Sequence, residues 1–155
     1  MEYHHKVLPP EVLLPQLLPL LEETDAIPLV ISGGSMSPFL AHGRDTVFLS
    51  KVDRPLKRGD MILYQRDSGK YILHRIWKVE NGSYTLVGDA QFQLEPGIRP
   101  DQVLAIVHSV QRKGKRLTHG SFWWEFFEKV WIRIVPLRRP IVKVYSMLAG
   151  MRNAS

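Results

Sequence analysis

Short apolar runs separated by turn-forming residues fill the middle of this chain, between residues 28 and 117. Runs of this kind, rich in β-branched and aromatic residues, are typical of strands. Asn81-Gly82 lies between two of them and favours a two-residue β-hairpin. The pattern predicts a mainly β, antiparallel domain. We expect its strands over residues 29–31, 45–52, 61–65, 71–79, 83–87, 103–110 and 111–117.

Helical patterns lie on either side of this β-rich region. Leucines repeat at helical spacing in residues 9–23, but Pro15 and Pro19 oppose a long helix. We therefore expect one short helix at about residues 16–24. The chain then divides into an N-terminal helical segment, a β-domain and a helical tail, over residues 1–27, 28–117 and 118–155.

The tail combines predicted amphipathic helices with an excess of basic and aromatic residues. Ser121 is suited to cap a helix over residues 122–135, and a second amphipathic segment continues to about Leu148. Residues 120–155 have 6 Lys/Arg against 2 Asp/Glu, within a net charge of +6 for the whole chain, and hold three of the four Trp. This mixture favours a membrane surface or a protein partner over nucleic acid. We expect part of the apolar surface to pack on the β-domain, and residues 120–155 to contact a membrane peripherally.

Other classes of protein are excluded by what the sequence lacks. It has no cysteine, and hence no disulfide and no thiol nucleophile. No stretch matches the roughly 20 apolar residues of a transmembrane helix, and the first residues do not read as a secretory signal. We therefore expect a cytoplasmic protein. We also expect no cofactor and no metal, because the histidines other than His74 lack ligand-like spacing; they are His4, His5, His42, His108 and His119.

Residues 31–40, ISGGSMSPFL, carry the most chemical information in the chain. Three small residues precede Ser35 and allow a tight bend that exposes its hydroxyl. They also let a substrate carbonyl approach backbone N–H groups closely. A serine is a weak nucleophile and needs a base within hydrogen-bond reach. Taken alone, so short a pattern more often marks a plain Gly-Ser turn.

Four sequence blocks in a fixed order go beyond a plain turn; they are residues 35–38, 56–64, 72–76 and 86–89. In this order they resemble the serine peptidase superfamily of signal peptidase I and LexA, and the resemblance covers about residues 28–110. It implies a coiled antiparallel β-domain, with the nucleophile in the first block and the base in the third. It also implies that the last Gly-Asp block closes the site.

The third block resembles that of the histidine-type signal peptidases of the endoplasmic reticulum and archaea, because His74 stands where other branches have lysine. The resemblance implies that Ser35 is the nucleophile, His74 the general base and Asp89 the supporting carboxylate. A lysine base needs burial to lower its pKa, whereas a histidine pKa is already near the working pH. A neighbouring carboxylate fixes the tautomer of the histidine and stabilises the imidazolium.

The oxyanion and substrate-binding residues that the resemblance implies are Ser32, Gly33, Gly34 and Met36. Many members of the superfamily have a serine two residues before the nucleophile, where this chain has Gly33. The oxyanion hole therefore either rests on the Ser35 N–H alone or uses Ser32 in a shifted turn. Glu95 loosely matches a second acidic residue of the eukaryotic branch.

The sequence thus predicts a signal-peptidase-like serine endopeptidase that cleaves a leader or signal segment of a peptide or preprotein. The substrate is expected to lie extended beside a strand edge. The alternative is a catalytically silent relative, a peptide-binding or accessory module of the same fold. A LexA-like self-cleaving regulator has less support, because the 27 residues before the β-domain are too few for a helix-turn-helix domain.

Overall fold

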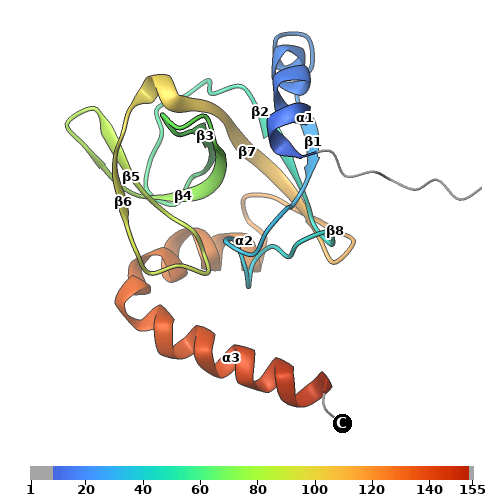
Figure 1. Cartoon of the computed structure of the whole chain (residues 1–155), viewed down its shortest axis with the longest axis vertical. Helices are drawn as coiled ribbons and strands as arrows, with labels where there is room; N and C mark the ends of the chain where they lie inside the picture. Colours follow the sequence, from blue (N-terminus) through green and yellow to red (C-terminus); the bar gives the residue numbers. More distant parts are fainter. Residues whose placement is uncertain (1–8, 154–155) are drawn as a thin grey trace, which may run out of the picture.

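The computed structural model describes the backbone of residues 9–153 and the side chains of residues 9–135 and 143–150. Within these residues it is mainly β, with one antiparallel sheet of 8 strands and three α-helices (Figure 1). The strand order is β1-β2-β7-β3-β4-β5-β6, and β8 pairs with β7. The strands are β1 (Ile27–Val30), β2 (Thr46–Ser50), β3 (Met61–Gln65), β4 (Tyr71–Glu80), β5 (Ser83–Val87), β6 (Glu95–Ile98), β7 (Val103–Arg112) and β8 (Lys115–Leu117).

The hairpin predicted at Asn81-Gly82 is confirmed by its turn, and a second hairpin joins the two strands expected over residues 103–117. Asn81 and Gly82 between β4 and β5 have φ of 49° and 78°. Lys113 and Gly114 between β7 and β8 have φ of 51° and 81°. Two successive left-handed residues form the turn whose twist matches that of the flanking strands. Residues of this kind at the hairpin tips are therefore why the chain reverses where the sequence predicts.

The sheet curls because its ladders are interrupted. Register shifts occur between β2 and β7, β3 and β7, β4 and β5, and β5 and β6. An extra residue in one strand bends it and increases its twist. Figure 1 shows the result, with β3 and β4 curled at the centre and β7 crossing beside them.

One strand was not predicted. The segment after Gly88 was expected to be a loop, but β6 lies within it and pairs with β5, with Leu86 opposite Glu95. Its sequence contains Pro96 and Gly97, which are depleted in strands. Proline is tolerated here because β6 ends the strand order, and an edge strand does not need every N–H.

The predicted N-terminal helix is present but begins earlier than expected. Helix α1 spans Pro10–Leu17 and continues as a 3-10 turn over Leu18–Glu22, where the prediction was about residues 16–24. Pro10 occupies the first turn, where no N–H bond is lost. Pro15 lies inside the helix, and the α-helix ends two residues later. The prolines therefore shorten and tighten the helix instead of preventing it.

The tail begins where predicted but is not one regular helix. Helix α2 (Phe122–Glu125) is followed by a π-helical turn (Phe126–Val130), a 3-10 segment (Trp131–Leu137) and α3 (Arg138–Asn153). A kink falls at Ile134, with φ −103° and ψ 30°. Ser121 precedes α2 but does not cap it, because its Oγ accepts the Thr118 N–H at 3.2 Å. A further 3-10 turn, Pro100–Gln102, separates β6 from β7.

Hydrophobic clusters join the tail to the sheet. Phe39 stacks on Phe127 with ring centroids 4.7 Å apart, and Trp124 and Trp131 are buried in the same cluster. The prediction that the apolar tail packs on the β-domain is therefore confirmed for these residues. A second buried cluster, on which the site below depends, contains Ile62, Tyr64, Ile76, Leu86, Ile98 and Ile106. In the described part of the chain, no helix is both long enough and apolar enough to cross a bilayer.

Candidate active site

Ser35 lies in the turn that follows β1, and this turn is anchored on both sides. Gly33 has φ +83°, a left-handed conformation that favours glycine. Its N–H donates to Nδ1 of His42 at 2.8 Å. Met36, on the other side of Ser35, is only 2% exposed and packs in the core. Ser35 itself is half-buried and is thus held at the border between core and solvent.

The loop after β5 is hydrogen-bonded to the backbone of the Ser35 turn. The Ala90 N–H donates to the Ser35 carbonyl at 2.9 Å. A Cβ on Gly88 would lie 2.6 Å from the same carbonyl oxygen, so this approach requires glycine. The indole N–H of Trp131 donates to the Asp89 carbonyl at 2.7 Å and ties the loop to the tail. The Gly88-Asp89 block therefore contacts the Ser35 turn through its backbone.

Ser35 and His74 line the same cleft, which has a volume of about 420 Å³. One wall is the turn at residues 31–36, and the other is residues 70–74 at the start of β4. His74 is 4% exposed, and its ring is therefore nearly enclosed. Within the described residues, no hydrogen bond joins Ser35 Oγ to a ring nitrogen of His74. The structure thus brings the two groups to one cleft without joining them.

The space in front of Ser35 is open. Ser32, Gly33 and Gly34 are exposed, and a Cβ on either glycine would meet nothing within 4 Å. In the part of the chain that the structure describes, no acceptor binds the backbone N–H of Ser35. A free N–H beside an open space is what an oxyanion hole requires. Of the two options that the sequence left open, this geometry favours the Ser35 N–H.

His74 is the first member of a hydrogen-bonded chain that begins in the core and ends partly exposed. Its Nδ1 lies 3.4 Å from the hydroxyl oxygen of Tyr64. That hydroxyl donates to Oε2 of Glu95 at 2.9 Å. Arg66 holds Glu95 with two bonds, from Nε to Oε1 at 2.9 Å and from Nη2 to Oε2 at 2.7 Å. The chain runs His74, Tyr64, Glu95, Arg66.

The hydrogen-bonded chain from His74 to Arg66 determines which ring nitrogen of His74 carries the proton. Tyr64 has one hydroxyl proton, and it is given to Glu95, so the hydroxyl oxygen faces His74 as an acceptor. Nδ1 then carries the ring proton, and Nε2 keeps a lone pair. A lone pair on Nε2 is what a general base needs to accept a proton from a serine.

Burial is the main influence on the protonation of His74. Desolvation lowers the pKa of His74 to about 4, with Arg66 also lowering it and the carboxylates of Glu95 and Asp89 opposing the shift. Arg66 and Tyr64 lower the pKa of Glu95 against its own desolvation, so this carboxylate is ionised at neutral pH. Burial, followed by Glu95, raises the pKa of Tyr64. At neutral pH His74 is therefore uncharged, as a base must be.

Asp89 is not bonded to His74 but to its neighbour. Arg75 binds both carboxylate oxygens of Asp89, from Nε and Nη2, at 3.0 Å each. The pair is almost fully buried, with 2% and 0% of the two side chains exposed. Arg75 also donates from Nη1 to the Gly59 carbonyl at 2.8 Å. Asp89 therefore influences His74 only through its charge, and it positions the loop that holds Ser35.

Tyr64 is the functional residue that sequence reasoning missed. Glu95 was noticed only as a loose match to an acidic position. The signal was in the β3–β4 pairing, where Ile62 lies opposite His74 and Tyr64 opposite Ile72. Residues two apart on a strand share a face, so Tyr64 is the diagonal neighbour of His74. That inference needs the register of the hairpin, which no single motif contains.

The chain was also compared with known proteins: no family model, no curated protein and no solved structure matches it. Its function is therefore inferred from the cleft itself.

Proposed function

We propose that this protein is a serine endopeptidase of the signal-peptidase type, with the coiled antiparallel β-fold of the signal peptidase and LexA superfamily. Ser35 is its nucleophile and His74 its general base. The observation that carries the proposal is that Ser35 and His74 line one open cleft, with a free Ser35 N–H among the described residues. The substrate is a leader or signal segment of a peptide or preprotein.

The reaction follows from the proton positions. Ser35 Oγ attacks the scissile carbonyl while its proton passes to Nε2 of His74. The carbonyl oxygen becomes an oxyanion and accepts the Ser35 N–H. His74 then gives the proton to the leaving amine, which leaves an acyl-enzyme that water hydrolyses by the same steps. Glu95 stabilises the transient imidazolium through Tyr64, and the Asp89 charge adds to this.

The strand edge in the cleft suits an extended peptide. Residues 71–75 of β4 pair with β3, whereas β5 pairs with β4 only from Arg75 onward. Within the described residues, the second edge of residues 71–74 therefore has no strand beside it. These are the residues that line the cleft opposite the Ser35 turn. A substrate added as a strand here gains backbone hydrogen bonds that do not depend on its sequence.

Cleavage of a panel of synthetic leader peptides, followed by mass spectrometry, tests the proposal. Ser35→Ala and His74→Ala should each abolish cleavage. Ser37→Ala is the matched control, since it removes a half-buried hydroxyl from the same turn and should leave cleavage unchanged. Wild-type cleavage that survives Ser35→Ala would refute the assignment. Binding of the peptides without any cleavage would instead support the alternative, a catalytically silent peptide-binding module.

The exposed face of the tail supports an active site held beside a membrane. Its apolar side chains that reach solvent are Phe122, Trp123, Val130, Val144, Tyr145, Met147 and Leu148. Lys129, Arg133 and Lys143 are exposed among them, while the side chains of Arg138 and Arg139 lie outside the described ones. Tryptophan and tyrosine suit the bilayer interface, and each basic residue near an anionic surface adds about 1 kcal/mol. In Figure 1, α3 extends along one end of the molecule, beyond the sheet.

Co-sedimentation with vesicles tests this membrane contact. Binding should require anionic phosphatidylglycerol, weaken with salt and fall when Phe122 and Trp123 are both changed to serine. Val79→Ser is the matched control, because it removes an exposed apolar side chain from β4, far from the tail in sequence. Equal binding of neutral and anionic vesicles, or none at low salt, would reject this part of the proposal.

A further inference from the structure

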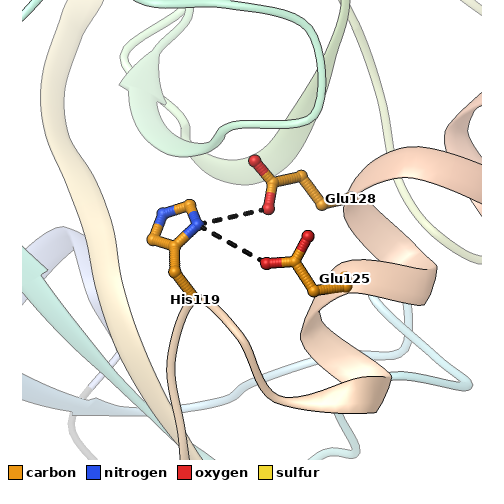
Figure 2. A group of neighbouring side chains, drawn as sticks. All are labelled: His119, Glu125 and Glu128. Carbon is orange, nitrogen blue, oxygen red and sulfur yellow. Dashed lines mark ion pairs between the residues drawn. The ribbon is translucent and has the colours of Figure 1, made fainter.

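Three potential metal ligands meet where the sheet passes into the tail. His119 follows β8, Glu125 ends α2, and Glu128 lies in the π-helical turn. Their ligand atoms all lie within 4.8 Å of one another. Figure 2 shows both carboxylates directed from one side of the helix at the same nitrogen of His119. Nδ1 of His119 is 3.4 Å from Oε2 of Glu128 and 4.0 Å from Oε1 of Glu125.

Glu128 provides an independent indication of a ligand. Its side chain is 5% exposed, yet among the described residues its Oε2 has no hydrogen-bond partner. A buried carboxylate oxygen without a hydrogen bond costs about 1–3 kcal/mol or more. The side chain cannot easily turn away, because Gly59 packs against it so closely that a Cβ there would lie 2.7 Å from its Cγ. The unsatisfied oxygen therefore stays directed at His119.

The separation of His119 and Glu128 matches that of two ligands on a small tetrahedral cation. Zinc binds imidazole nitrogen and carboxylate oxygen at about 2.0–2.2 Å, which places two ligands of a tetrahedron roughly 3.3–3.6 Å apart. The 3.4 Å between His119 and Glu128 lies within this interval. Glu125, 4.0 Å from His119, must move inward at the end of α2, and its side chain, which is partly exposed, has room to do so. We propose that His119, Glu125 and Glu128 bind a zinc ion, with water in the fourth position.

The site is partly prepared before any ion binds. The Gly120 N–H donates to Oε1 of Glu125 at 2.9 Å and fixes the loop against the helix. Lys129 contacts Oε2 of Glu125 at 2.6 Å, and Lys57 contacts Oε1 of Glu128 at 3.7 Å. Both lysines thus leave the oxygen that faces His119 to the ion, although their charges weaken its binding.

A bound ion would join three consecutive pieces of structure. The loop after β8, α2 and the π-helical turn would all be tied to one centre. The aromatic cluster of the tail begins at the same place, since the ring centroids of His119 and Trp124 are 5.2 Å apart. Zinc at this position would therefore stabilise the attachment of the tail to the sheet. This role is independent of the cleft at Ser35.

Calorimetric titration with Zn²⁺ tests the proposal on chelator-treated full-length protein. His4→Ala and His5→Ala are introduced in every sample, because these adjacent histidines, which lie outside the described residues, offer adventitious ligands. We expect one ion per chain and a rise of Tm on adding zinc. His119→Asn and Glu128→Gln should each weaken binding at least tenfold. His108→Asn, another exposed histidine, is the matched control and should bind zinc as before.

Cobalt replaces zinc in a second measurement, since the visible absorption of Co²⁺ distinguishes four-coordinate from six-coordinate sites. A four-coordinate spectrum that disappears in His119→Asn would support the site. His119 is exposed, so this variant should fold even if Glu128→Gln does not, and circular dichroism checks both. No zinc binding once His4 and His5 are replaced, or undiminished binding in His119→Asn, would overturn the proposal. The contacts of His119 with the two glutamates would then be structural only.

Discussion

His74 and Arg75 are neighbours on β4, and their side chains are linked to two different carboxylates, the half-buried Glu95 and the buried Asp89. His74 reaches Glu95 through the hydroxyl of Tyr64, in a chain that borders the cleft. Arg75 binds Asp89 directly with two hydrogen bonds, away from solvent. Successive residues of a strand point to opposite faces of the sheet. One strand thus separates the proposed general base, which would gain and lose a proton, from an ion pair held away from solvent.

The comparison teaches that an acidic residue near a candidate catalytic histidine need not be its partner. Arginine is the better partner for a fully buried carboxylate, since its planar fork satisfies both oxygens. Once Asp89 is bound in this way, its lone pairs no longer serve the imidazole. The intervening Tyr64 lets the half-buried Glu95 orient His74 without placing a full charge beside it. Four predictions test this division, beginning with the largest effect.

Asp89→Asn should affect stability before it affects chemistry. It leaves the guanidinium of Arg75 buried without a counter-charge, which costs about 3–5 kcal/mol of unfolding free energy. Urea unfolding at pH 7 measures this loss. Glu95→Gln is the control, because Glu95 is more exposed than Asp89, and its loss should cost much less. A stable Asp89→Asn protein with a large fall in kcat would instead make Asp89 the partner of His74.

The pH dependence of stability should identify His74. Its pKa is about 4 in the folded protein and about 6.5 when unfolded, so the unfolded chain binds the proton first as the pH falls. Stability is therefore unaffected by this group above pH 6.5 and is lost between pH 6.5 and 4. One pKa unit corresponds to about 1.4 kcal/mol, so the loss approaches about 3 kcal/mol.

Urea unfolding at pH 7 and at pH 4.5 measures this loss, with His74→Asn as the comparison. The variant should lose about 2–3 kcal/mol less than the wild type over this interval. The same shift places the acid limb of kcat/KM near pH 4 instead of near 6.5. An acid limb above pH 8 would favour a lysine base, and Lys70 already lines the cleft.

Gly88→Ala sharpens the comparison from the other side. The added Cβ would lie 2.6 Å from the Ser35 carbonyl oxygen and push the nucleophile turn outward. We expect the free energy of unfolding to fall by about 1–3 kcal/mol, as is usual when a packed core is overfilled. We also expect kcat to fall, and by a larger fraction of its wild-type value than the free energy of unfolding does. Gly34 provides the control, because its φ is ordinary and an added Cβ would meet nothing within 4 Å. Gly82 would not serve, because its φ of 78° would strain any other residue. Gly34→Ala should therefore be tolerated structurally, and unfolding measurements on both variants check the contrast.

The sequence predicts correctly those parts of the fold that depend on neighbouring residues alone. Asn81-Gly82 predicts its hairpin because few residue pairs adopt two left-handed conformations. Strand β6 was missed because Pro96 and Gly97 are acceptable only at an edge, and an edge is a property of the whole sheet. The helical tail was placed correctly, but its π-helical turn depends on how the aromatic side chains pack.

The site was predictable to the same extent. The small residues before Ser35 and the histidine on β4 were visible in the sequence, and the structure brings both to one cleft. The partner of Asp89 was not visible in the sequence. Strand alternation places His74 and Arg75 on opposite faces of the sheet, so only one of these two side chains can reach Asp89. The carboxylate therefore could not be assigned from motif order alone, because the register decides which side chain it meets.

Tyr64→Phe should have the smallest effect and the most specific one. It removes one hydroxyl that accepts from His74 and donates to Glu95, for a net loss of about 1 kcal/mol of stability. Without that acceptor, Nδ1 of His74 no longer favours the protonated tautomer, so Nε2 carries the proton part of the time. We expect kcat to fall roughly fivefold to tenfold, which is the same free energy expressed as a rate. Tyr71→Phe, a half-buried tyrosine that lines the same cleft, is the matched control and should leave kcat unchanged. Because Glu95 orients His74 through the hydroxyl, Glu95→Gln should lower kcat by a smaller factor once Tyr64 is phenylalanine, leaving only the direct effect of its charge on His74. If the effects of Tyr64→Phe and Glu95→Gln on the activation free energy simply added, Glu95 would not act on His74 through Tyr64. The charge of Asp89 would then be the more important influence on the base.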